Sequence, residues 1–382
     1  MGIVPAASQA SSGGVTYTPE PRVASIACVS NCAPSKRIQG GSAVKITGQN
    51  LDGVTKVVFK GGGSKADDEM SAVKTHSAGA LTVGVPMSAQ TGPVQALASE
   101  GVQSQPSKPV RILPPPPPEA HTELSPAPGP RDDGAPSLET ATSSARWFLG
   151  SRRGVVFSYR LGGSAPADVE VNLIRQSDGA IVQTWAQPAV APGEVRTIRW
   201  TGVTNGQVQG EGRYAFRATV HNGSATTSNA ADDDPSRDAF DLYGHIFPVR
   251  GSHNYGGAGA RFGASRSGHT HQGQDVLAAC GTVLAAAQGG TVKYAAYQSA
   301  AGYYIVIHGL DGTDNAYMHL AGPTPFAEGD TVFTGQQIGI VGDTGDATAC
   351  HLHFEIWTAP GWYDGGHVID PLPSLQAWDR FS

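Results

Sequence analysis

The sequence predicts an all-β protein of several domains. Of its 382 residues, 50 are Gly and 27 are Pro, whereas only 15% are charged, and this composition favours short strands joined by turns over helical bundles. Short runs of alternating apolar and polar residues recur along the chain, and the C-terminal third has no long run with the helical period of 3.6 residues. A chain of this length exceeds one ordinary core, so we expect two or three domains.

Charge and hydropathy exclude two classes of function. The net charge of −6 is mild and no run of Lys and Arg occurs, so binding to nucleic acid has no electrostatic support. No stretch of 18 apolar residues occurs, so no membrane-spanning segment is predicted.

The cysteines point to an exported protein. The four Cys fall into two pairs, Cys28 with Cys32 and Cys280 with Cys350, which fits a secreted or cell-envelope setting. Residues 1–20 have neither the basic start nor the apolar stretch of a signal peptide. Either such a peptide has been removed or the inference of export is wrong, and we favour removal.

The first predicted folded region is a β-sandwich over residues 23–113, after a small and polar segment at 1–22 that we expect to be disordered. Short strands alternate with turn signals there, at 43–47, 56–59 and 81–86. The motifs at 46–51, 57–59, 85–86 and 91–94 resemble those of IPT/TIG immunoglobulin-like domains. Nothing in this region looks catalytic.

A Pro-rich linker is predicted over residues 114–142, beginning with five consecutive prolines. Such a segment favours an extended spacer, although a ligand for a proline-recognition module is an alternative. A second β-sandwich follows over residues 143–229. Its motifs Trp200-Thr201-Gly202 and Gly212-Arg213-Tyr214 resemble the Ig-like repeat of FlgD-type flagellar hook-cap proteins, and we expect a spacer without chemistry. Asp232-Asp233-Asp234 then marks a boundary, as a solvated hinge or, alternatively, a Ca²⁺ site.

Histidines mark the third domain, predicted over residues 240–382 as a mostly antiparallel β domain. Nine of the 12 His lie between His245 and His367. The stretch 350–357 reads as a strand with two unlike faces, because side chains alternate along a strand. Leu352, Phe354 and Ile356 form its core face, and the opposite face carries His351, His353, Glu355 and Trp357.

These residues can supply a catalytic zinc site, which needs three protein ligands and one open position. His271 and Asp275 are separated by a turn containing Gly273, and His353 completes a set of two His and one Asp. Zinc in such a set lowers the pKa of bound water toward about 7. His319 and His351 remain for proton transfer and for stabilising a developing oxyanion. A purely structural zinc site is the alternative, but this ligand set is not typical of one.

Residues 245–382 resemble the lysostaphin/LytM-type peptidoglycan metalloendopeptidases. The resemblance implies zinc ligands at His271, Asp275 and His353 and catalytic histidines at His319 and His351. The matching motifs, in chain order, are Arg261-Phe262-Gly263, His271-x-Gly273-x-Asp275, Gly281-Thr282, Gly289-Gly290-Thr291-Val292, Tyr317-x-His319, Gly329-Asp330-x-Val332, Gly335-Gln336-x-Ile338-Gly339 and His351-Leu352-His353-Phe354.

The sequence departs from that family at one point. Some members place a Tyr shortly before the first zinc His to steady the transition state, whereas the nearest Tyr upstream here is Tyr255. Arg266 and His269 are candidates to replace it, and we assign neither. Glu355 either supports a zinc ligand or is an outward strand residue. Cys350 is excluded as a ligand, because its side chain should face away from His351 and His353.

The sequence therefore predicts an exported zinc metalloendopeptidase that hydrolyses peptide bonds of bacterial peptidoglycan, in the stem peptide or cross-link, through zinc-activated water. A non-hydrolytic cell-wall peptide-binding or surface protein is the alternative. The family frame also predicts a Cys280–Cys350 disulfide, because both segments flank the metal, and Cys28–Cys32 is a candidate second bridge. No particular bond and no oligomeric state is predicted.

Overall fold

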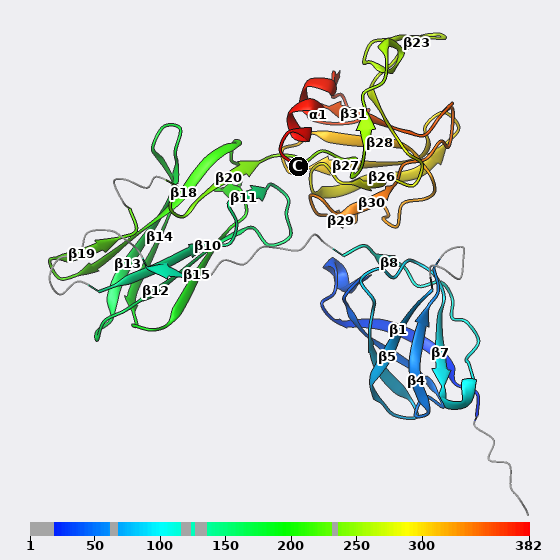
Figure 1. The fold of residues 1–382 in the computed structure, drawn as a ribbon, viewed down its shortest axis with the longest axis horizontal. Helices are drawn as coiled ribbons and strands as arrows, with labels where there is room; N and C mark the ends of the chain where they lie inside the picture. The colour runs from blue at the N-terminus through cyan, green and yellow to red at the C-terminus, as the bar shows by residue number, and fades with distance from the viewer. Residues whose placement is uncertain (1–18, 62–67, 116–123, 127–135, 231–235) are drawn as a thin grey trace, which may run out of the picture. The chain divides into compact units, whose positions relative to one another are not determined.

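The computed structural model describes residues 19–61, 68–115, 124–126, 136–230 and 236–382, and these residues form mostly strands (Figure 1). A single α-helix occurs among them, α1 (Leu372–Asp379), so the all-β prediction is confirmed. Disorder was predicted for residues 1–22; of these, 1–18 lie outside the described residues, and β1 already begins at Arg22. Most of the linker and the acidic boundary at 232–234 also lie outside the described residues. The chain divides into two compact units, Met1–Pro114 and Pro115–Ser382. No helix in the described ranges is long and apolar enough to cross a membrane.

The first unit is an antiparallel β domain around an apolar core. Its main strands run in the order β1-β3-β6-β5-β4-β7, and the short strands β2 and β8 pair in parallel. Alternate residues such as Val44 and Ile46 point inward and pack with Val57 and Phe59. Cys28 and Cys32 form a disulfide. The elements are β1 (Arg22–Ser30), η1 (Pro34–Lys36), β2 (Ile38–Gln39), β3 (Ala43–Gln49), β4 (Val54–Phe59), β5 (Glu69–His76), β6 (Ala80–Gly84), β7 (Val94–Ala98), η3 (Ser99–Gly101) and β8 (Ile112–Leu113).

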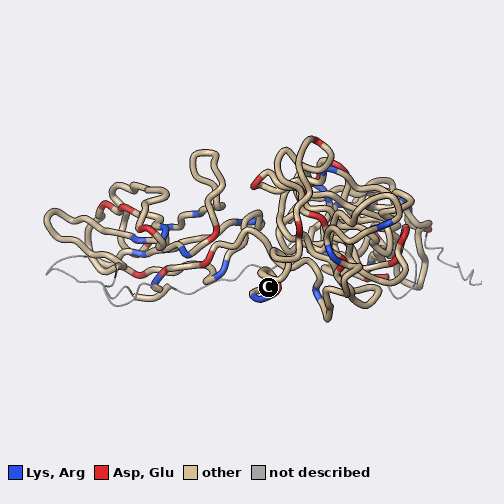
Figure 2. Tube along the Cα trace, turned by 90° about the horizontal axis from the view of Figure 1, so that it is seen from above, with Lys and Arg blue, Asp and Glu red and all other residues tan. Residues whose placement is uncertain are grey.

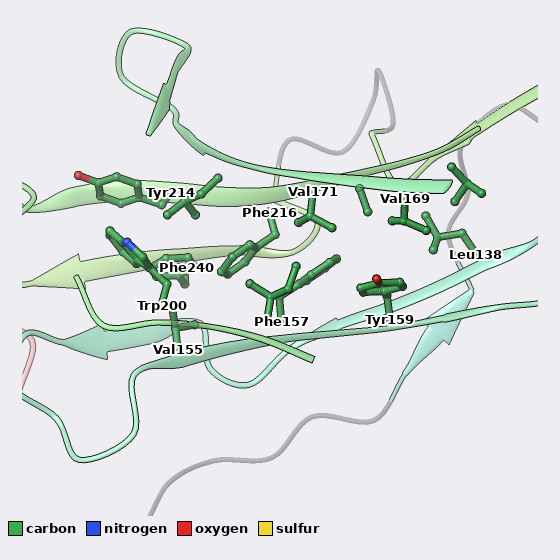
Figure 3. Close-up of a cluster of buried hydrophobic side chains, with 14 of the residues drawn as sticks. Leu138, Val155, Phe157, Tyr159, Val169, Val171, Trp200, Tyr214, Phe216 and Phe240 are labelled. Carbon is green, nitrogen blue, oxygen red and sulfur yellow. The ribbon is translucent and has the colours of Figure 1, made fainter. Parts of the chain in front are cut away.

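The second unit begins with two facing sheets, β15-β12-β10-β9 and β11-β20-β18-β13-β14 with β19 beside β18. Aromatic side chains from both sheets meet between them (Figure 3), and Phe157 stacks on Phe216 with ring centroids 5.0 Å apart. The strands are β9 (Ser125–Pro126), β10 (Leu138–Thr142), β11 (Arg146–Phe148), β12 (Val155–Leu161), β13 (Ala167–Arg175), β14 (Ala180–Val190), β15 (Val195–Trp200), β16 (Val203–Thr204), β17 (Gln207–Val208), β18 (Gly212–Asn222), β19 (Ala225–Ser228) and β20 (Ala239–Tyr243).

This sandwich extends beyond the predicted range of 143–229 at both ends. β10 pairs with β12, and β20 pairs with β18 and, in parallel, with β11. Phe240 and Leu242 are buried in the sandwich core. β20, which includes the predicted boundary at 240, thus buries its apolar side chains in the sandwich core, and the predicted domain ranges stay predictions.

The C-terminal domain is built on one antiparallel sheet in the order β21-β24-β31-β28-β27-β26-β29, with β32 beside β31. The hairpin of β22 and β23 projects from this domain (Figure 1). Trp378 of α1 packs edge-on against Phe354 of β31. The strands are β21 (His253–Asn254), β22 (Ser265–Arg266), β23 (His269–Thr270), β24 (Gln274–Ala278), β25 (Val283–Ala285), β26 (Gly290–Gln298), β27 (Gly302–Gly309), β28 (Asp314–Leu320), β29 (Thr331–Val332), β30 (Gln337–Ile340), β31 (His351–Trp357) and β32 (Val368–Ile369), with one 3-10 turn, η4 (Ala258–Ala260).

Within the second unit, the sandwich and the C-terminal domain meet backbone to backbone. The Thr334 amide donates to the Gly150 carbonyl over 3.2 Å, and the Gly289 amide donates to Thr334 Oγ1 over 2.7 Å. Nearby, the rings of Tyr243 and Phe381 stack with centroids 4.1 Å apart. A side chain at position 289 would prevent this close approach of the two domains, because a Cβ on Gly289 would lie 2.5 Å from the Gly150 oxygen and 2.7 Å from the Thr334 nitrogen.

We predict that Gly289→Ala destabilises the second unit by about 1–3 kcal/mol, the usual cost of forcing a methyl group into a packed site. Chemical denaturation of the full chain measures the loss. Gly322→Ala is the matched control, because a Cβ there meets no atom within 4 Å. Equal stability of the two variants would contradict the close contact between the domains.

Candidate metal centre

The candidate site lies on one face of the C-terminal sheet, where β31 runs between β24 and β28. The strand register places Asp275 of β24 directly opposite His353 of β31. Directly opposed residues share a face of the sheet and lie within reach of each other. The sheet therefore brings together two predicted ligands that are far apart in the sequence.

The third predicted ligand, His271, directly follows β23 of the β22–β23 hairpin and lies three residues before β24 begins. His271 Nε2 lies 3.0 Å from Asp275 Oδ1 and 2.9 Å from His353 Nδ1. His353 Nδ1 is also 3.0 Å from Asp275 Oδ1. One donor atom from each of these three residues lies within 4.8 Å of the others, so together they can hold a metal ion.

Hydrogen bonds outside the triad fix which nitrogen each imidazole presents. His271 Nδ1–H donates to the Arg261 carbonyl over 2.8 Å, which leaves Nε2 as the donor atom for a cation. His353 Nε2–H donates to Glu355 Oε1 over 3.0 Å, which leaves Nδ1. Partners of this kind orient a metal-binding His and raise its basicity.

The donor set fits zinc. Two imidazole nitrogens and a carboxylate oxygen at about 3 Å from one another repel unless a positive charge lies between them. Ligands at 2.0–2.1 Å from a tetrahedral Zn²⁺ are about 3.3 Å apart, so the observed spacing would open by only a few tenths of an ångström. Two His and one Asp also leave the fourth position open, as a catalytic site requires.

The electrostatics of the triad show the same need for a positive charge. Burial alone would raise the pKa of Asp275, but hydrogen bonds with His271 and His353 lower it below the usual range. Burial alone would lower the pKa of His353, but its hydrogen bonds with Asp275 and Glu355 raise it to about 9. A proton on the triad would supply this positive charge in the absence of a metal, and a cation would have to displace it.

Glu355 contacts the predicted ligand His353, which fits the supporting role, one of the two roles that the sequence left open. Its side chain is buried, with 4% exposure. Oε1 accepts the hydrogen bond from His353, and Oε2 accepts one from Trp357 Nε1 over 2.7 Å and another from Trp362 Nε1 over 3.2 Å. The indole partners were missed, although Trp357 was placed on the same strand face as Glu355.

His319 reaches the site through an unusual backbone conformation. Met318 is opposite His353 in the register, so strict alternation would turn His319 to the other face. Instead His319 has a φ of 61°, a left-handed conformation that is uncommon outside glycine and is often found at functional sites. Its ring centroid lies 4.6 Å from that of His351 and 6.0 Å from that of His353.

His319 and His351 are held in the same way. His319 Nδ1–H donates to the Thr344 carbonyl over 2.8 Å, and His351 Nδ1–H donates to the Ala349 carbonyl over 2.8 Å. In both rings Nε2 is therefore the nitrogen left for other chemistry, and that of His351 lies 3.6 Å from Asp275 Oδ1. Burial lowers the pKa of His319 to about 4, so this ring is neutral at pH 7.

Gly273 is required because β31 passes too close to it for any side chain, and not because of the turn that the sequence suggested. A Cβ at this position would lie 2.5 Å from the Phe354 carbonyl oxygen and 2.6 Å from His353 Nε2. Any side chain there would displace the His353 ring or the backbone of β31. The glycine between the first two ligands is thus explained by the close approach of β31.

Of the residues considered as replacements for the upstream Tyr, one reaches the triad. Arg266 Nη2 lies 3.4 Å from Asp275 Oδ2. His269 is exposed, and its Nδ1–H donates to the Ser267 carbonyl, whereas the Tyr255 hydroxyl donates to Asp379. Arg266 is therefore placed to interact with the carboxylate ligand.

The predicted disulfide between Cys280 and Cys350 is confirmed. Cys280 follows β24 and Cys350 directly precedes β31, so the bridge joins the two strands that carry Asp275 and His353. The cysteines are 70 residues apart, and closing such a loop contributes about 4 kcal/mol in the chain-entropy model. The remaining histidines of this domain lie outside the triad; His308, for example, donates to Asp314.

Comparisons with known proteins identify a family for the C-terminal domain. Residues 269–371 match Peptidase family M23, so the chain carries an M23 peptidase domain at its C-terminus. An uncharacterized metalloprotease of Haemophilus influenzae is 36% identical over 104 residues, which is 27% of this chain and 20% of that protein. The peptidoglycan DD-endopeptidase ShyC of Vibrio cholerae is 29% identical over 184 residues, 46% of this chain and 41% of that protein.

Among solved structures, the catalytic domain of the antimicrobial peptidase lysostaphin from Staphylococcus simulans shares 31% identity. The match covers 33% of this chain and 92% of that domain, with a TM-score of 0.28. This chain spans less than half the length of the two curated relatives. The resemblance of the two preceding β domains to IPT/TIG and FlgD-type domains stays a prediction.

We predict that Glu355→Gln weakens zinc binding about 10–100-fold, because it removes the charge that holds His353 Nε2–H. Titration against a chelator of known zinc affinity measures this. Glu328→Gln, at an exposed glutamate of the same domain, should leave the affinity unchanged. Unaltered zinc affinity in Glu355→Gln would show that Glu355 does not support the ligand.

Proposed function

Because its C-terminal residues form an M23 peptidase domain, we propose that this chain is a zinc endopeptidase that hydrolyses peptide bonds of bacterial peptidoglycan. The observation that carries the proposal is the convergence of His271, Asp275 and His353 beside two further imidazoles. The similarity to a protein named as a peptidoglycan DD-endopeptidase supports the choice of substrate.

The roles of the five residues follow from their hydrogen bonds. His271, Asp275 and His353 would hold Zn²⁺, which when bound polarises a carbonyl and lowers the pKa of water. His319 and His351 each keep Nε2 available because a backbone carbonyl occupies Nδ1. They can take a proton from water that attacks the scissile carbonyl and return it to the leaving amine. Once it has taken this proton at Nε2, the ring becomes a donor that would also stabilise the developing oxyanion.

We further propose that the protein acts in the cell envelope or outside the cell. All four cysteines are paired in two disulfides, which persist in oxidising compartments and are rare in the cytosol. Peptidoglycan peptides, the proposed substrate, are found in the same compartment.

We predict different losses for the two histidines of the His-x-His pair. His353→Ala removes a ligand, so zinc content and activity should fall together. His351→Ala and His319→Ala leave the ligand set whole, so each should retain zinc while turnover falls by roughly 10²–10⁴. The double variant should be little worse than either single variant, because groups that act as one unit are not additive. Elemental analysis beside kinetics measures both quantities.

Replacement of a histidine outside the triad provides the control for this series. His367→Ala, at an exposed position, should change neither zinc content nor turnover. If His351→Ala lost its zinc while His353→Ala kept it, the assignment of ligand and proton carrier would be reversed.

We also predict that the full chain releases soluble fragments from purified peptidoglycan. Mass spectrometry of digests of several chemically distinct peptidoglycans should show new amino and carboxyl termini at one type of peptide bond. His353→Ala is the control and should release none. A zinc-loaded chain that binds peptidoglycan but cleaves none of these substrates would instead support a non-hydrolytic cell-wall-binding protein.

A further inference from the structure

A cavity of about 710 Å³ lies between the second sandwich and the C-terminal domain, within the second unit. The sandwich wall includes Trp147 and Val156, and the wall from the C-terminal domain includes Ile246 and Phe381. None of the five residues assigned to the metal centre lines it. The cavity is therefore separate from the candidate metal centre, and its volume is typical of sites for small ligands.

The charge of this cavity is unusual for the chain. Its lining includes no Asp, Glu, Lys or His. Five arginines line it, namely Arg146, Arg152, Arg153, Arg199 and Arg250. The whole chain has a net charge of −6, and basic and acidic positions are interspersed along its trace (Figure 2). The fold thus gathers positive charge from separate segments into one cavity.

The hydrogen bonds of four of these arginines, all but Arg153, leave their charge without a counterion among the described residues. Arg146 Nη1 donates to the Phe381 carbonyl over 3.1 Å, Arg199 donates to the Arg153 carbonyl, and Arg250 Nη1 donates to the Phe247 carbonyl over 3.3 Å. A carbonyl orients a guanidinium but does not neutralise it. Among the described residues, Arg146, Arg152, Arg199 and Arg250 pair with no carboxylate.

We propose that this cavity binds a multiply charged oxyanion, an anionic ligand that carries phosphate or carboxylate groups. A guanidinium presents a planar set of donors that matches the oxygens of both groups. Several arginines around one space repel one another and create a positive potential, which a ligand with two or more negative charges would relieve. Ser143, Ser144 and Ser151 add hydroxyl groups to the lining. The ligand would contact both domains, because Arg199 belongs to the sandwich and Arg250 to the C-terminal domain.

Two sources in a bacterial envelope offer this chemistry, namely phosphate-bearing polymers and the carboxylates of peptides. Isothermal titration of the full chain with inorganic pyrophosphate and with citrate, at low ionic strength, distinguishes them. One saturable site is expected, and the anion that binds more tightly identifies the source. Arg199→Gln and Arg250→Gln should each weaken binding about tenfold or more, the effect of losing a charged hydrogen bond.

Two further variants make this test specific. Arg196→Gln is the matched control, because Arg196 lies on the same strand as Arg199, pairs with Glu194 at 2.8 Å and does not line the cavity. His353→Ala should retain binding, which shows that the anion does not bind at the metal centre. The proposal is overturned if neither anion binds saturably, or if binding survives in both Arg199→Gln and Arg250→Gln. Because the readout is binding in a variant without the zinc site, failure here leaves the proposed peptidase function untouched.

Discussion

The pairing of β24 with β31 is the constraint on which the candidate site depends. It places Asp275 directly opposite His353, and a slip of one residue would turn His353 to the core face. The Cys280–Cys350 bridge joins the same two strands, and Gly273 permits β31 to approach without a clash. The strand pairing, the disulfide and Gly273 are thus all consistent with one register of β31 against β24. The geometry of the ligands is a property of the sheet more than of any single loop.

Bringing the ligand atoms of His271, Asp275 and His353 together costs free energy unless each buried polar atom has a partner. Two buried imidazole nitrogens and a carboxylate within about 3 Å need a positive charge among them. The outward-facing nitrogens are satisfied by the Arg261 carbonyl and by Glu355, which in turn accepts from two indoles. His319 and His351 are anchored by backbone carbonyls. The site is therefore organised around the ligands before any metal binds, which lowers the reorganisation that binding requires.

Much of this site could be predicted from the sequence, because strand alternation is a short-range property. Alternation placed His351, His353 and Glu355 on one face of the strand. For His319, alternation alone would place the side chain on the opposite face, and only its left-handed backbone conformation turns the ring toward the site. The Arg261 carbonyl could not be found from side-chain patterns. The pairing of β20 with the sandwich could not be predicted, because a short apolar strand does not reveal which core it joins. The arginines of the cavity come from three segments about 50 residues apart, so no single run of basic residues in the sequence indicated this cavity.

The central claim is that His271, Asp275 and His353 bind the zinc ion on which peptide hydrolysis depends. X-ray absorption at the zinc edge of the purified full chain tests it most directly. The expected result is a shell of nitrogen and oxygen at about 2.0–2.1 Å, with the outer scattering of two imidazoles and no sulfur. A sulfur shell at about 2.3 Å, or a protein that binds no zinc at all, would contradict it.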